Sequence, residues 1–171
     1  MFVDECGTHT SMARLRARAP RGERAYGPVP RNRGTSTTLL ASMGVGGMGA
    51  CLTVERATTK VVFETYVERV LAPSLSAGQV VVMDNLSAHK GERVRELIER
   101  RGCELVFLPP YSPDFSPIEE AFSKVKAHLR KAARTRGLLV EAIGTALRAV
   151  TPEDAVGSFG HCGYLPAAQT S

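Results

Sequence analysis

The sequence predicts an α/β fold in which a mixed sheet is flanked by helices, and three observations lead to this class. Two apolar segments, residues 37–43 and 50–54, surround a cluster of glycines, which predicts an antiparallel hairpin. Two short apolar runs, residues 79–83 and 104–108, enclose a helical pattern, which predicts a parallel β-α-β unit. Apolar residues at helical spacing follow, and this alternation of strands and helices is typical of α/β proteins.

Length and composition predict one domain. The chain has 171 residues, of which 43% are hydrophobic, so it can bury a core and is not a disordered chain. We assign residues 1–165 to this domain and residues 166–171 to a loose tail. The least polar stretch, residues 39–54, is broken by glycines and too short to span a membrane. Four scattered cysteines and no signal peptide predict reduced thiols in a cytoplasm.

The first predicted strand is short. Residues 1–3 are apolar and are followed at once by Asp4 and Glu5, which we interpret as a strand end. A strand normally has about 5–6 residues, so we expect a truncated first strand. The carboxylate geometry requires that residues 1–4 pair with the strand at 37–43.

A strongly basic stretch follows. Between Arg14 and Arg33 there are seven arginines and one acid, so this stretch carries a charge of +6 in a chain whose net charge is +5. It is either a solvated loop or a segment that contacts phosphates, because the arginine fork matches phosphate geometry.

Four helices are predicted from apolar residues that recur at i, i+3, i+4 and i+7. The first covers residues 63–71 and ends near Pro73, and the second lies around 94–101 and is stopped by Gly102. The third is long and begins at Ser116 and Pro117, which are suited to the N-cap and the first helical position. The last covers residues 139–150.

Two acids follow apolar strands, and both are candidates for chemistry. Asp4 and Asp84 lie where the first and fourth strands are expected to end, and ligands of open α/β sheets gather at the carboxyl ends of strands. A partly buried carboxylate favours a divalent cation as partner. The alternative for Asp84 and Asn85 is a plain turn, since both residue types favour turns.

A third carboxylate is available at the start of the long helix. With 100° per residue, Glu119 lies at the edge of the apolar stripe, whereas Glu120 faces solvent. Glu119 can therefore reach the sheet. It also fits a capping box with Ser116, in which it would only bond back to the helix start.

The motifs around these acids resemble a known family. The segment Asp-Asn-Leu-Ser-Ala-His-Lys at 84–90, followed by Leu-Pro-Pro-Tyr-Ser-Pro-Asp-Phe-Ser-Pro-Ile-Glu at 108–119, resembles the DDE transposases of the mariner superfamily. The closer resemblance is to the bacterial insertion-sequence 630 family, with Ser116 where that family usually has Asn. There are 34 residues between Asp84 and Glu119, the spacing typical of the superfamily.

The resemblance implies an RNase H-like fold and a catalytic, metal-binding triad of Asp4, Asp84 and Glu119. It also implies two Mg²⁺ ions, for which Mn²⁺ can substitute, and oxygen ligands suit both metals. The implied activity is cleavage of transposon ends and strand transfer into double-stranded target DNA at TA dinucleotides. Asn85 and His89 are expected either behind the metal ligands or facing DNA, with a plain turn or helix-start role as the alternative for each.

Basic residues are the candidates for DNA contact, and a solvated helix face is the alternative for those on the long helix. The candidates are Arg14, Arg16, Arg18, Arg21, Arg24, Lys124, Lys126 and Arg130.

Family members usually carry helix-turn-helix modules before the catalytic domain, and we see none in this sequence. We expect a homodimer associated with the bacterial nucleoid. Because no such module is seen, we also expect an upstream helix-turn-helix polypeptide as a further partner. The alternative function is a catalytically impaired remnant that binds DNA or dimerises and so inhibits transposition. An RNase H-like nuclease with another substrate is a third hypothesis, which the 108–119 segment disfavours.

Overall fold

The structure, a computed structural model, describes residues 1–13, 18–27, 36–110, 112–132 and 136–164. Within these residues the chain forms a five-stranded sheet with the order β3-β2-β1-β4-β5. β1, β2 and β3 are antiparallel neighbours, whereas β4 runs parallel to β1 and β5 parallel to β4. The predicted mixed sheet is thus confirmed. The strands are β1 (Phe2–His9), β2 (Ser36–Gly44), β3 (Gly47–Glu55), β4 (Val80–Met83) and β5 (Glu104–Phe107).

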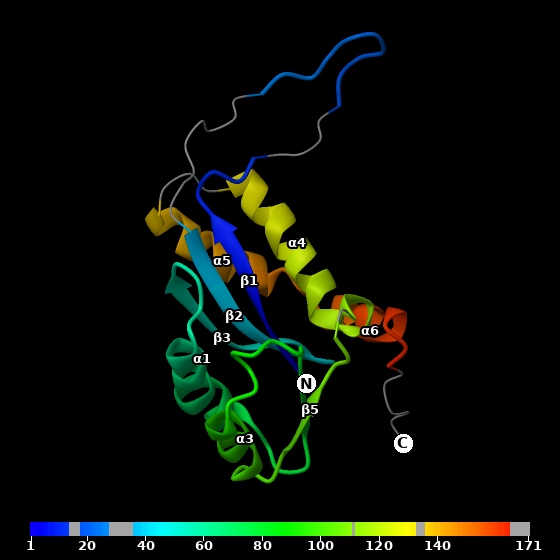
Figure 1. Cartoon of the computed structure of the whole chain (residues 1–171). Coiled ribbons are helices and arrows are strands. Elements are labelled where there is room, and N and C mark those ends of the chain that lie inside the picture. The colour runs from blue at the N-terminus through cyan, green and yellow to red at the C-terminus, as the bar shows by residue number, and fades with distance from the viewer. Residues whose placement is uncertain (14–17, 28–35, 111, 133–135, 165–171) are drawn as a thin grey trace.

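Helices cover both faces of the sheet (Figure 1). α1 continues without a break through the π-helical segment η1 into α2, so the predicted first helix passes Pro73. α6 was missed by the sequence analysis, although the Thr151 side chain caps it in a capping box. The helical segments are α1 (Lys60–Tyr66), η1 (Val67–Leu71), α2 (Ala72–Ser74), α3 (Glu92–Glu99), the short 3₁₀ segment η2 (Pro113–Phe115), α4 (Pro117–Ala132), α5 (Arg136–Arg148) and α6 (Pro152–His161).

The prediction that the first strand ends at Asp4 is wrong. β1 has eight residues and pairs with β2 along its whole length, from Phe2 opposite Met43 to His9 opposite Ser36. The polar second half is stable as a strand because β2 provides hydrogen-bond partners for its polar groups. The buried Thr8 hydroxyl, for example, donates to the carbonyl of Thr37 at 2.8 Å. The expected pairing of residues 1–4 with the second strand is confirmed.

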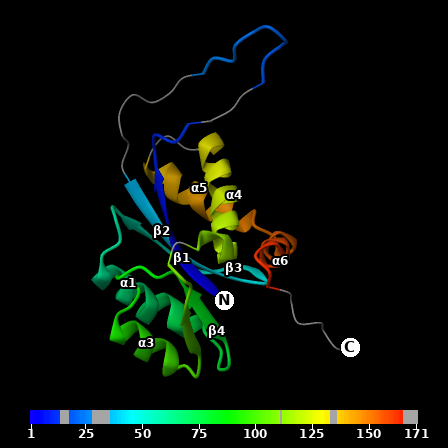
Figure 2. The same ribbon diagram turned by 45° about the vertical axis from the view of Figure 1, so that its right-hand side comes forward.

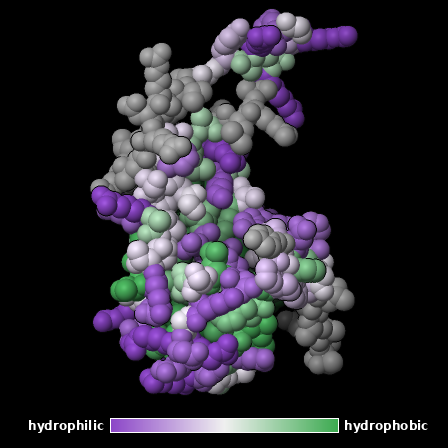
Figure 3. All heavy atoms as spheres, in the orientation of Figure 1, coloured by the Kyte–Doolittle hydropathy of each residue, from purple (hydrophilic) through white to green (hydrophobic). Residues whose placement is uncertain are grey.

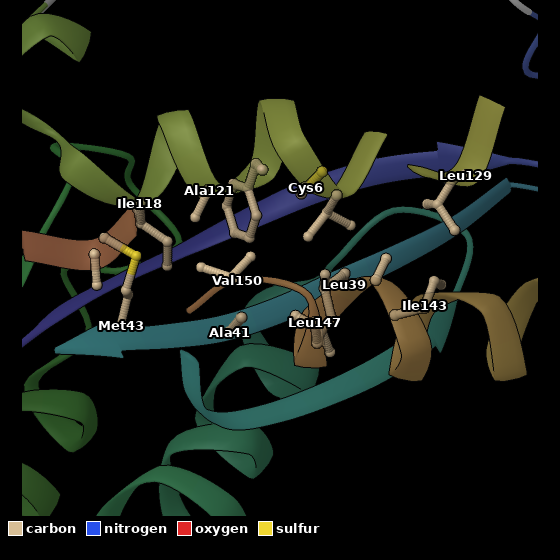
Figure 4. Packing of buried hydrophobic residues seen from close by; sticks show 14 of the residues in the cluster. Cys6, Leu39, Ala41, Met43, Ile118, Ala121, Leu129, Ile143, Leu147 and Val150 are labelled. Atoms are coloured by element: carbon tan, nitrogen blue, oxygen red, sulfur yellow. The ribbon is translucent and has the colours of Figure 1, made fainter. Parts of the chain in front are cut away.

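The sheet separates two hydrophobic cores, as the view in Figure 2 shows, with α1 and α3 on one side and α4, α5 and α6 on the other. Figure 4 shows the second core, where Ile118, Ala121 and Leu129 of α4 lie over Cys6 of β1. Alternate residues of β1 enter opposite cores, and Val3 packs on the α1 side. This alternation fixes which side chains of β1 face α4.

Several expectations concern the ends and the solvent-facing parts of the molecule. Among the described residues, no helix has both the length and the apolar character needed to cross a bilayer. None of the four cysteines forms a disulfide. The predicted tail, residues 166–171, lies outside the described residues.

Candidate active site

Asp4 is the third residue of the central strand, β1, and lies on the face that α4 covers. Its neighbours on that face, Phe2 and Cys6, belong to the α4 core, and Asp4 itself is only 8% exposed. The backbone N–H of Glu5 donates to Asp4 Oδ1 at 2.7 Å. An acid in this position is held rigidly, because β1 is hydrogen-bonded on both sides, to β2 and to β4.

Asp84 follows β4 directly and comes to the level of Asp4. The parallel register pairs Val3 with Met83, so the next residue of each strand, Asp4 and Asp84, continues side by side. Asp84 thus lies at the carboxyl end of its strand, as the sequence predicted. The chain reaches this point because residues 80–83 form an apolar strand, with Val81 and Met83 buried, that ends just before Asp84.

Glu119 enters from the helix layer. It is in the first turn of α4, which begins at Pro117 and packs its apolar face on β1 through Ile118 and Phe122. Glu119 lines the same groove as Asp4 and Asp84. The helix therefore brings the third carboxylate to the sheet edge, as its angular position predicted.

The contrast between the two glutamates is only partly as expected. Glu120 does not line the groove, and its side chain is 41% exposed, so it faces solvent as expected but also makes a contact. Its carboxylate accepts a hydrogen bond from Nδ1 of His161 on α6, and of the two glutamates it is Glu119 that is the more exposed. This contact comes from α6, a helix that the sequence pattern did not predict.

The groove has a volume of about 560 Å³ and is open to solvent on one side. One wall is the loop between β5 and α4, which is the Pro-rich part of the 108–119 motif. Glu5, which the sequence analysis did not single out, also lines the groove. The lining residues are Asp4, Glu5, Asp84, Asn85, Leu86, Leu108, Pro109, Pro110, Ser112, Pro113, Ser116 and Glu119.

The three carboxylates influence one another electrostatically. Burial first of all, together with the negative charges of Asp84 and Glu119, raises the pKa of Asp4 from 3.8 to about 7. The hydrogen bond from Glu5 and the charge of His89 act in the opposite direction. A desolvated carboxylate next to two like charges requires a cationic partner to stay ionised at neutral pH.

The donor set fits a hard divalent cation, since it consists of carboxylate oxygens from three different elements. A cation would replace the repulsion felt by Asp4 with attraction. In the part of the chain that the structure describes, however, no three His, Cys, Asp or Glu side chains are gathered closely enough around one point to form a complete metal site. The fit is therefore one of donor chemistry: the three carboxylates line one groove, but they are not gathered around a single point.

A family model described as DDE superfamily endonuclease matches residues 1–138, a span that contains all three acids. The chain belongs to the DDE endonuclease superfamily. This confirms the superfamily resemblance, while the narrower insertion-sequence 630 assignment stays a prediction. No curated protein matches the chain.

Solved structures show the same fold. The chain in a pre-cleavage Mos1 transpososome superposes with a TM-score of 0.73 and 16% identity, over 94% of this chain and 52% of that one. For the Mos1 strand transfer complex the TM-score is 0.71 at 18% identity, over 94% and 51%. For the catalytic domain of Mos1 mariner transposase these values are 0.60 and 14%, over 74% and 69%. The RNase H-like fold predicted for this DDE superfamily member is confirmed, and the chain spans about half the length of the first two.

The two residues expected near the three acids lie in different environments. Asn85 lines the groove beside Asp84. His89 is completely buried, so it does not face DNA, and its Nδ1 is hydrogen-bonded to Asp84 Oδ1. Asn85 thus lies within the groove, and His89 lies behind it.

The predicted DNA-contacting residues fall into three groups. Arg14 and Arg16 lie outside the described residues. Arg18, Arg21 and Arg24 are exposed on a loop that projects beyond the end of β1, where Figure 3 shows hydrophilic side chains standing out into solvent. The third group is on α4.

The basic residues of α4 do not share one face. Lys126 and Arg130 lie within about 20° of Glu119 around the helix axis, whereas Lys124 is about 140° away. Lys124 instead forms an ion pair with Asp154 of α6. The Lys126 ammonium interacts with the thiol of Cys6, which is on the Asp4 face of β1. Lys126 therefore belongs beside the candidate active site, and Lys124 does not.

Proposed function

We propose that this chain is the catalytic domain of a mariner-type DDE transposase, which cleaves DNA at transposon ends and transfers the cut strand into a target at TA dinucleotides. The observation that carries the proposal is that Asp4, Asp84 and Glu119, from three separate elements, line one groove. The family match over residues 1–138 supports the same reading. The narrower origin in the insertion-sequence 630 family is part of this proposal.

Asp4, Asp84 and Glu119 are the residues that would hold two ions of the Mg²⁺ or Mn²⁺ type. When bound, such ions supply activation of the attacking water or 3′-hydroxyl and neutralise charge on the phosphate. Solved Mos1 complexes with Mn and with Mg are among the structures of similar fold. The strand and helix that carry Asp4 and Glu119 pack on each other through a buried core, so these two carboxylates start close to their working positions.

Lys126 and Arg130 would bind phosphates of the DNA that enters the groove. Both lie on the Glu119 face of α4, and an ammonium and a guanidinium suit phosphate contact without reading sequence. Asn85 lies in the groove itself and can donate from its amide to a phosphate or a base. The exposed arginines of the 18–27 loop would extend this contact along the duplex.

Recognition of transposon ends would require more than this domain. The first Mos1 structures that it matches are complexes described as a transpososome and a paired-end complex, and their chains are about twice as long as the matched part. We therefore propose a homodimer that brings two ends together, with an upstream helix-turn-helix polypeptide as the further partner.

The decisive experiment is strand transfer of pre-cut transposon ends, taken from the DNA that flanks the gene, into a plasmid in the presence of Mn²⁺ or Mg²⁺. Glu119→Gln is compared with the matched control Glu120→Gln, the neighbouring glutamate that points to α6. We expect Glu119→Gln and Asp84→Ala to abolish product, and Glu120→Gln to retain most of it.

Equal losses in the two glutamine variants would show that the groove is not where the reaction occurs. Activity that survives Asp84→Ala would refute the mechanism. The insertion sites, read by sequencing, test the TA preference separately.

A further inference from the structure

We propose that His89 is a positioning residue for Asp84: its Nδ1–H holds Oδ1 of the carboxylate and thereby presents the other oxygen, Oδ2, to the groove. This inference rests on the proposed function, because it concerns how one metal ligand is oriented. It assigns His89 a role inside the protein and excludes contact with DNA.

The first observation is where the hydrogen bonds on Asp84 fall. His89 Nδ1 and the backbone N–H of Leu86, at 3.2 Å, both bond to Oδ1, and these are the hydrogen bonds that the described residues make to this carboxylate. The backbone N–H of His89 in turn donates to the carbonyl of Leu86 at 3.0 Å. The loop after β4 thus curls back on one oxygen of the acid and leaves Oδ2 for a ligand.

The second observation is how His89 is fixed. Its ring is completely buried and stacks on Phe63 of α1, with 4.1 Å between ring centroids and 28° between ring planes. Phe63 is itself fully buried in the core on the α1 side of the sheet. The His89 imidazole therefore connects a rigid core to the Asp84 carboxylate at the groove. The Asp84 side chain is 34% exposed.

The third observation assigns the proton. A carboxylate only accepts hydrogen bonds, so the proton shared with Asp84 must come from Nδ1. Nε2 is buried and has no hydrogen-bond partner among the described residues. His89 thus uses one nitrogen, and the other contributes no contact that a substitution would break.

A purely structural role, in which His89 only fills space and closes the loop, makes a different prediction. In that case every substitution should affect stability and metal binding in parallel. A positioning role separates the two, because ring packing and hydrogen bonding can be removed independently.

Two substitutions make this separation. His89→Phe retains the stacked ring on Phe63 and loses only the Nδ1 donor. His89→Asn loses the ring but places an amide N–H in the position of Nδ1. Asp84→Asn serves as the reference for loss of the ligand itself.

The measurement is Mn²⁺ binding to the protein without DNA, by calorimetry or by electron paramagnetic resonance, together with the melting temperature. We expect His89→Phe to keep a melting temperature near that of the wild type and to bind Mn²⁺ about 10–100-fold more weakly, as is usual when the partner of a ligand is removed. We expect His89→Asn to melt lower but to bind Mn²⁺ better than His89→Phe.

The outcomes distinguish this inference from the proposed function. Wild-type Mn²⁺ binding that is lost in Asp84→Asn but unchanged in His89→Phe overturns the role of His89 alone. The same holds if His89→Asn binds more weakly than His89→Phe, because binding then follows packing. A wild-type protein that binds no Mn²⁺ overturns both proposals.

Discussion

Replacing Asp4 by Asn should stabilise the metal-free protein at neutral pH, even though it removes a proposed metal ligand. The pKa of Asp4 is raised from 3.8 to about 7, mainly by burial. Between these two values the folded protein holds a proton on Asp4 that the unfolded chain has released. The free energy of unfolding of the wild type therefore falls as pH rises from about 4 to about 7 and is then level.

The size of this effect follows from the shift. A difference of about three pKa units, at 1.36 kcal/mol for each, corresponds to about 4 kcal/mol. Asn has no charge to desolvate, and its side-chain oxygen can still accept the 2.7 Å hydrogen bond from Glu5. The variant should equal the wild type near pH 4 and exceed it by up to about 4 kcal/mol at pH 8.

Urea unfolding in the presence of a chelator, at several values between pH 4 and pH 8, measures this difference directly. Millimolar Mg²⁺ provides the control, since it should raise the stability of the wild type at pH 8 much more than that of the variant. Parallel stability curves for the two proteins across this pH range would refute the burial argument.

Three further outcomes are expected. Lys126→Ala combined with Arg130→Ala should weaken DNA binding and reduce the slope of log K against log salt by about two, whereas Lys124→Ala should leave that slope unchanged; filter binding at several salt concentrations measures this. Asp154→Asn should lower the free energy of unfolding at pH 7. This destabilisation should shrink on acidification, because the hydrogen bond with Lys124 is the main cause that lowers the pKa of Asp154 to about 2, and the stabilisation that Asp154 provides is lost as pH falls toward that value. Urea unfolding at pH 7 and pH 3 measures the difference. Phe122→Ala should cost about 3–5 kcal/mol, measured in the same way, since Phe122 is 1% exposed in the α4 core.

The sequence predicted most accurately the elements whose stability is local. The apolar run before Asp84 and the helix after Pro117 were both placed within a residue or two, because each carries its own pattern. The second half of β1 was missed because Glu5 and His9 look like loop residues and become strand only through pairing with β2. α6 was missed for a similar reason: its glycines weaken the helical pattern, and the Thr151 cap was the available signal.

At the candidate site, spacing and resemblance predicted three acids that line one groove, but not their surroundings. Glu119 was placed correctly by its angle on the helix, whereas the contact of Glu120 with His161 depends on an unpredicted helix. His89 could not be recognised as buried, since its position against Phe63 is set by how the sheet and α1 pack. Sequence pattern specifies which residues share an element, and packing between elements decides which of them meet.

The position of β1 at the centre of the sheet has a consequence for the order of folding. β1 pairs with β2, and β2 pairs with β3, in an antiparallel meander, whereas the other edge of β1 pairs with β4, with Phe2 opposite Val82. During synthesis Asp4 therefore leaves the ribosome long before Asp84 and Glu119 exist. The meander can form while the first carboxylate is still hydrated, and the cost of bringing like charges together falls on the last steps, when β4 and then α4 dock. Ions that bind the three acids would act at that stage, as ligands of the completed fold rather than of its nucleus.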